Sequence, residues 1–69
     1  MTVSEFLAKC QGEMTRQEFC ERVGISEAML SRLYSGERLP GGSTMRKMAA
    51  HWPRIVGEYL VSLSKEDAA

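Results

Sequence analysis

The sequence contains no long apolar run, only two cysteines and two prolines, and no net charge. Its uncharged stretches are broken by Gly, Pro or a charged residue within a few positions, so we expect neither a signal peptide nor a membrane-spanning segment. Cys10 and Cys20 are too few for a disulfide scaffold and lack the paired spacing of a zinc site. We therefore expect both to be reduced core residues of a cytoplasmic protein.

The residues that carry most enzyme chemistry are also scarce. His51 is the single histidine, and no nucleophile, second histidine or carboxylate cluster stands at a useful spacing from it. There is no phosphate-binding glycine-rich loop and no metal-binding constellation. The sequence predicts no enzyme activity and no cofactor, and it predicts His51 to end a helix before Pro53. Five larger side chains are assigned to the core: Met14, Met29, Met45, Met48 and Trp52.

A net charge of zero argues against an indiscriminate nucleic-acid coat, which needs a large positive excess. The charges are nevertheless unevenly distributed, because residues 1–25 carry a balance of minus one and residues 55–69 a balance of minus two. Residues 26–54 carry plus three, from Arg32, Arg38, Arg46, Lys47 and Arg54 against Glu27 and Glu37. The middle of the chain is therefore its electropositive part.

Helical spacing explains nearly every apolar residue, and a chain of 69 residues forms one small domain that buries only about 60% of its unfolded surface. Three helices are predicted by a capping residue at the start and a glycine at the end: Thr2 to Gly12, Thr15 to Gly24, and Ser26 to Gly36. Thr2 with Glu5, and Thr15 with Glu18, have capping-box spacing.

The second half of the chain predicts a loop and two further helices. Residues 35–42 contain Pro40 and three glycines and are expected to form an ordered loop. Ser43 or Thr44 is expected to cap the fourth helix, and Pro53 fits the first position of a fifth helix. That C-terminal helix is predicted over about residues 53–64, with residues 64–69 frayed. The fold class is therefore all-α, a compact bundle of about five short helices in a single domain over residues 1–69.

Two short helices joined by three or four residues that include a glycine must cross at a steep angle, as in a helix-turn-helix at about residues 15–35. Between Thr15 and about Trp52 the sequence resembles the helix-turn-helix proteins of the phage repressor and Cro type, the XRE-like family. The residues that carry this resemblance are Thr15, Glu18, Phe19, Cys20, Gly24, Ile25, Ser26, Leu30, Ser31, Leu33, Gly36, Pro40, Ser43, Met48 and Ala49. Cys20 stands where the family usually has Ala, at the crossing of the two helices, and Gly24 stands where the turn needs positive φ.

The resemblance implies a lambda-repressor-like fold and a sequence-specific transcription regulator, a repressor of phage or bacterial origin, with the recognition helix at residues 26–35 in the major groove. It implies that four residues read base edges: Glu27, Ala28, Ser31 and Arg32. Many relatives carry Gln at the position of Glu27, so that residue has two readings, a base contact or stabilisation of the helix N-terminus. Phosphate contacts are expected from the edges of the motif, at Arg16, Gln17, Ser35, Arg38, Ser43, Arg46 and Lys47.

One recognition helix contacts few base pairs, so the resemblance implies a homodimer on a palindromic double-stranded DNA operator, with half-sites roughly 34 Å apart. The dimer candidates form an apolar stripe on the last helix: Ile55, Val56, Tyr59, Leu60 and Leu63. The same stripe has a second reading, in which all of it closes the monomer core. An alternative function is a protein-interaction module, an antitoxin or antirepressor that keeps the fold and binds a regulatory protein partner. Zero net charge and the acidic residues Glu21, Glu27 and Glu37 favour that alternative.

Overall fold

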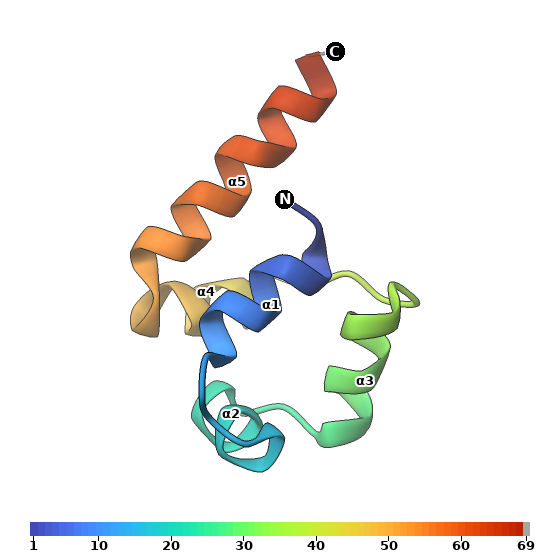
Figure 1. The fold of residues 1–69 in the computed structure, drawn as a ribbon, viewed down its shortest axis with the longest axis vertical. Coiled ribbons are helices and arrows are strands. Elements are labelled where there is room, and N and C mark those ends of the chain that lie inside the picture. Colours follow the sequence, from blue (N-terminus) through green and yellow to red (C-terminus); the bar gives the residue numbers. More distant parts are fainter. Residues whose placement is uncertain (69) are drawn as a thin grey trace.

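The computed structural model describes the backbone of residues 1–68 and the side chains of residues 1–64. This part of the chain folds into five helices without a strand (Figure 1). The helices are α1 (Val3–Gln11), α2 (Arg16–Val23), α3 (Glu27–Ser35), α4 (Gly42–His51) and α5 (Pro53–Ala68). The all-α fold class predicted from the sequence is confirmed.

The first three helices begin at the hydroxyl residues that the sequence marked as caps. The side chains of Thr2, Thr15 and Ser26 each accept a hydrogen bond, 3.1 Å long, from the backbone amide three residues later. The reciprocal half of the two expected capping boxes is not formed, because no hydrogen bond returns from the carboxylates of Glu5 and Glu18 within the described residues. The hydroxyl group alone therefore fixes each start.

The fourth helix begins earlier than predicted. Its N-cap is Gly41, not Ser43 or Thr44, and it has no side-chain cap hydrogen bond. The carbonyl of Gly41 accepts from the amide of Met45 at 2.9 Å. Glycine is tolerated at an N-cap about as well as threonine, so packing can decide the start. The register that results buries Met48 and half-buries Thr44 and Met45.

The fifth helix begins at Pro53 as predicted and continues to Ala68, four residues beyond the predicted end. After Gly57 the sequence has no glycine or proline to stop it, and Lys65, Glu66 and Ala68 are good helix formers. The helical backbone therefore includes residues 65–68, which the sequence placed beyond the helix, and residue 69 lies outside the described residues. In Figure 1, α5 extends away from the group formed by the other four helices.

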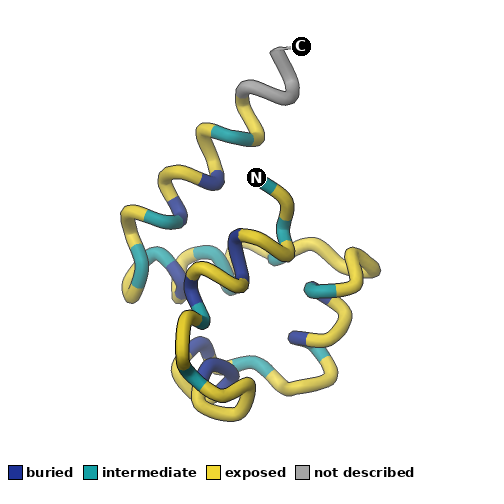
Figure 2. The backbone as a smooth tube through the Cα atoms, viewed as in Figure 1, coloured by how far each residue is buried: buried dark blue, intermediate teal, exposed yellow. Residues whose placement is uncertain are grey.

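The core lies where α1, α2, α3, α4 and the first half of α5 face one another, with their outer sides exposed (Figure 2). Eleven side chains are buried: Phe6, Leu7, Cys10, Phe19, Cys20, Val23, Leu30, Leu33, Met48, Val56 and Tyr59. The rings of Phe6 and Tyr59 stack with centroids 4.3 Å apart, and Phe19 meets Trp52 at 5.5 Å. None of the buried side chains among residues 1–64 is charged.

The side chains assigned to the core from the sequence are found there. Met48 is fully buried, while Met14, Met29, Met45 and Trp52 are partly buried and pack against the core cluster. Cys10 and Cys20 are buried free thiols, and burial raises the pKa of Cys10 to about 11. His51 is exposed at the last position of α4, as predicted.

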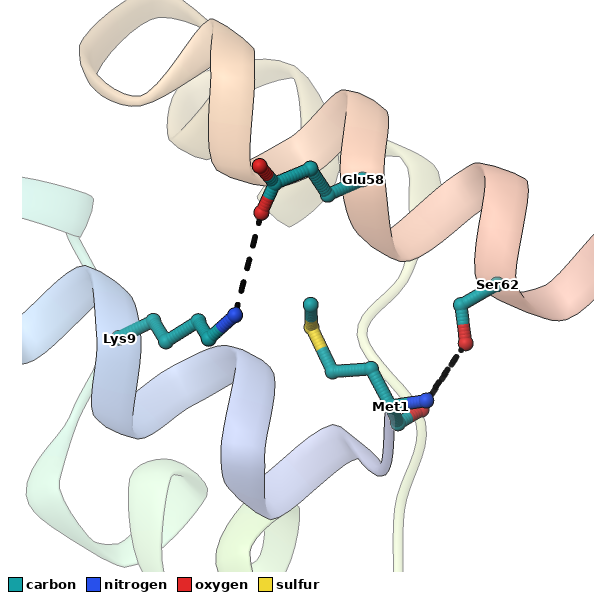
Figure 3. A network of polar contacts seen from close by, with 4 residues as sticks. All are labelled: Met1, Lys9, Glu58 and Ser62. Atoms are coloured by element: carbon teal, nitrogen blue, oxygen red, sulfur yellow. Dashed lines mark hydrogen bonds and ion pairs between the residues drawn. The ribbon is translucent and has the colours of Figure 1, made fainter.

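Polar contacts join α1 and the N-terminus to α5 (Figure 3). The amino group of Met1 donates to Ser62 Oγ at 2.7 Å. Lys9 Nζ lies 3.9 Å from Glu58 Oε2, and both side chains are about half exposed, so solvent screening leaves this ion pair little stabilising effect. The stacking of Phe6 on Tyr59 in the core joins the same two helices.

Gly24 is the glycine whose replacement is most restricted, because both its backbone conformation and a neighbouring side chain oppose a Cβ atom at this position. Its φ of +80° lies in the left-handed region, and a Cβ at this position would lie 3.3 Å from Lys47 Nζ. Gly57 is the matched contrast, since it lies inside α5 without positive φ, and an added Cβ would have no neighbour within 4 Å.

We predict opposite effects for alanine at these two positions. Gly24→Ala lowers the free energy of unfolding by about 1 to 2 kcal/mol, because a side chain is strained at positive φ. Gly57→Ala raises it by about 0.5 to 1 kcal/mol, because alanine is the better helix former. Urea unfolding followed by circular dichroism measures both, and a Gly24→Ala protein as stable as the wild type would contradict the assignment of strain.

Candidate nucleic-acid interface

The turn between α2 and α3 forms the centre of the candidate site. Gly24 adopts the left-handed conformation, and the amides of Gly24 and Ile25 both donate to the carbonyl of Cys20, at 2.7 and 3.0 Å. The positive φ predicted at Gly24 is thus confirmed. Cys20 is itself buried. A tight turn over a small buried side chain allows the two helices to pack closely while they cross.

The recognition helix α3 has two faces with different roles. Leu30 and Leu33 are fully buried and anchor its inner face to the core. The four predicted base-reading residues, Glu27, Ala28, Ser31 and Arg32, are all exposed. They fall at i, i+1, i+4 and i+5, which places them together on the outer face. The structure therefore brings this predicted set together on one accessible surface.

Arg16, a predicted phosphate contact, is placed against the recognition helix. Arg16 Nη2 donates to Ser31 Oγ at 2.7 Å. The guanidinium carbon also lies 5.7 Å from the centroid of the Tyr34 ring, within cation–π distance. The first residue of α2 therefore contacts α3 at two successive turns.

Tyr34 is in turn fixed from α1. Its hydroxyl donates to Gln11 Oε1 at 2.8 Å, and its carbonyl accepts from Ser4 Oγ at 2.8 Å. Gln11 Nε2 donates to the carbonyl of Met14 at 3.0 Å. Partial burial raises the pKa of Tyr34, and the neighbouring Arg16 opposes that shift. The phenol therefore stays protonated and remains a donor at neutral pH.

Sequence reasoning did not identify Tyr34, Gln11 or Ser4 as supports of this surface. Their partners lie 23 and 30 residues apart in the chain, so no local spacing indicates the contacts. Cys20 is also buried near the turn. The pKa of its thiol is raised mainly by burial and to a smaller extent by the carboxylate of Glu27.

The remaining predicted phosphate contacts are all exposed and lie on three segments: Gln17 on α2, Ser35 at the end of α3 with Arg38 in the loop after it, and Ser43, Arg46 and Lys47 on α4. Gln17 Nε2 lies 3.4 Å from Glu21 Oε1. Ser35 Oγ donates to the carbonyl of Arg32 at 3.1 Å and accepts from the amide of Glu37, so its hydroxyl closes the end of α3. Lys47 reaches the turn at Gly24.

The basic side chains of this region form no ion pair with any side chain that the structure describes. Among residues 1–64, whose side chains are described, the one ion pair joins Lys9 to Glu58 on the helices α1 and α5. The guanidinium groups of Arg32, Arg38 and Arg46 thus have no carboxylate partner in that part of the chain. They are available to an anionic ligand.

Comparison with known families shows that residues 7–51 match the helix-turn-helix family. The match includes the crossing helices α2 and α3 and extends over well more than half of the chain, so the protein belongs to the helix-turn-helix family of the phage repressor and Cro type. It is a DNA-binding transcription regulator. Neither the curated proteins nor the solved structures gave a significant match.

Two further observations concern the described residues. No helix among them has both the length and the apolar composition that a membrane crossing requires. Within residues 1–64 no group of three or more His, Cys, Asp and Glu side chains is arranged to hold a metal ion.

Proposed function

We propose that this protein is a sequence-specific repressor of phage or bacterial genes that inserts α3 into the major groove of its operator and excludes polymerase. The observation that carries the proposal is the exposed row of Glu27, Ala28, Ser31 and Arg32 on a helix whose opposite face is fully buried. The major groove is wide enough to admit such a helix. The protein would act in the cytoplasm, where bacterial DNA lies.

Three residues of the row have side chains whose chemistry fits a particular base edge. Arg32 has no carboxylate partner among the described side chains and can donate two hydrogen bonds to guanine O6 and N7. Ala28 can contact a thymine methyl group, and Glu27 can accept from cytosine N4. Glu27 also lies in the first turn of α3, where a carboxylate stabilises the helix dipole without any DNA.

The DNA backbone would be held from both sides of α3. Arg16 and Gln17 begin α2, Ser35 ends α3 and Arg38 follows it, and the basic residues of α4 add Arg46 and Lys47. The N-terminus of α4 also contains Ser43, and its first-turn amides have no side-chain cap. Free amides and a positive dipole end favour a phosphate there.

We further propose that two copies bind a palindromic operator and associate through α5. Val56 and Tyr59 are buried in the monomer, and Ile55 is half-buried. Leu60 and Leu63 flank that stripe but remain 52% and 37% exposed. A second copy would offer the same apolar side chains in a self-complementary contact, and the zero net charge opposes this association only weakly.

The first prediction concerns base recognition. Selection from a random oligonucleotide pool should yield a symmetric site, and Arg32→Ala should bind it about 10- to 100-fold more weakly, because a bidentate contact to guanine contributes about 1 to 3 kcal/mol. The matched control is Arg22→Ala, which removes an exposed arginine on α2 that has no proposed role. Equal affinities for both variants would contradict the role of Arg32.

The second prediction concerns phosphate contacts. Affinity for the selected site should fall steeply as salt is added, and Arg38→Ala and Arg46→Ala should each reduce the log–log slope by about 0.9, the value for one neutralised phosphate. Lys9→Ala serves as the control, since Lys9 lies on α1 beside Glu58. Fluorescence anisotropy at several salt concentrations measures the slopes, and a flat salt dependence would overturn the phosphate assignment.

The third prediction concerns assembly. Leu60→Asp should shift sedimentation to the monomer and weaken binding to the symmetric site, whereas Val61→Asp should do neither. Val61 is 55% exposed, close to the 52% of Leu60. Because Val61 is the next residue along the helix, its side chain points about 100° further round the helix axis and away from the apolar stripe. A wild-type protein that sediments as a monomer and binds an asymmetric site would rule out this dimer.

The interaction-module alternative is tested by the same experiments. Glu27 and Glu37 are exposed near the candidate interface and would repel DNA phosphates. Failure of the wild type to bind any sequence at low salt would favour a protein partner instead.

A further inference from the structure

Arg16 occupies an unusual position for a residue expected only to contact phosphate. It is exposed, yet its guanidinium is held by Ser31 on one side and lies over the Tyr34 ring on the other. Tyr34 is itself anchored to α1 through Gln11 and Ser4. The side chain of Arg16 is therefore placed before any DNA arrives.

The direction of the hydrogen bond between Arg16 and Ser31 follows from their chemistry. A guanidinium can only donate, whereas a hydroxyl has one hydrogen to donate and two lone pairs that accept. Ser31 must therefore be the acceptor in the 2.7 Å contact. Its own hydrogen has no acceptor among the described residues and stays available on the outer face of α3.

Arg16 also changes what Ser31 can recognise. A hydroxyl that accepts from a cation becomes a better donor, because hydrogen bonds in a chain polarise one another. A second donor group approaching the same oxygen would meet the positive charge of the guanidinium. A serine hydroxyl with no protein partner can contact any base. The hydroxyl of Ser31, bound to Arg16, instead favours a hydrogen-bond acceptor on the base edge and disfavours a donor.

We propose that Arg16 is a specificity-determining residue that acts through Ser31, orienting its hydroxyl to donate to a base acceptor in the major groove. The acceptors offered there are purine N7, guanine O6 and thymine O4, while cytosine offers only its N4 amino donor. The base that Ser31 contacts is therefore any base except cytosine. This inference rests on the proposed function, because it assumes that α3 enters the major groove.

A pure phosphate contact by Arg16 would behave differently. Such a contact weakens binding to all sequences by the same factor when it is removed, and it carries no base preference. Arg16 has further N–H groups besides the one that Ser31 uses, so it can still contact a phosphate. The decisive quantity is therefore discrimination at one base pair and not affinity alone.

The test compares base preferences of the wild type, Arg16→Ala, Ser31→Ala and the double variant in selections from one random pool. Anisotropy then measures affinity for the selected site and for sites with each replacement at the base pair where Ser31→Ala loses its preference. Gln17→Ala is the matched control, because it alters the next residue of α2 and leaves the contact to Ser31 intact. Circular dichroism checks that each variant folds, and Arg16→Met, which keeps a long unbranched side chain but has no N–H to donate, replaces Arg16→Ala if that variant does not.

We expect the wild type to reject cytosine at this base pair by about 10-fold, within the range for a specific base contact. Arg16→Ala should lose most of that discrimination. The double variant should discriminate against cytosine no less than Ser31→Ala does alone. Gln17→Ala should weaken all sites equally. Selection of cytosine by the wild type, or an Arg16→Ala protein with unchanged discrimination, would overturn the inference while leaving DNA binding established. Absence of any wild-type binding at low salt would instead remove the proposed function itself.

Discussion

The close crossing of α2 and α3 is the constraint on which the rest of the structure depends. It requires a left-handed residue at Gly24, a small buried side chain at Cys20, and a carbonyl on Cys20 that accepts two amides. Together these features turn the chain sharply enough that α3 can bury Leu30 and Leu33 while its other side stays in solvent. A wider turn would allow the two helices to lie side by side and cover that surface.

Most of the fold follows from local signals in the sequence, because helix ends are set by short-range hydrogen bonds. Thr2, Thr15 and Ser26 cap the first three helices, and Gly12, Gly24 and Gly36 end them at positive φ. The start of α4 could not be predicted in this way. Ser43 and Thr44 have the right chemistry for a cap, but the helix includes both residues, and Gly41 takes the N-cap position without a side-chain hydrogen bond.

The candidate site was predictable in part for the same reason. The outer face of α3 follows from helical periodicity once the helix boundaries are known, so Glu27, Ala28, Ser31 and Arg32 could be grouped from the sequence alone. The placement of Arg16 against Ser31 and Tyr34 could not, because it depends on how two helices cross. Similarly, periodicity gives one apolar stripe on α5, and only the packed structure separates the buried Tyr59 from the exposed Leu60.

The core formed by the described residues contains no charged side chain, and this has a consequence for how such a protein can change over time. Stability resides in side chains such as Phe6, Phe19 and Met48, none of which belongs to the exposed row on α3. Replacing Glu27, Ala28 or Arg32 opens no cavity and leaves no buried group unpaired, so a lineage can acquire a new target sequence without first gaining stability in reserve. Ser31 is less free to vary than these three neighbours, because a replacement there also has to suit Arg16.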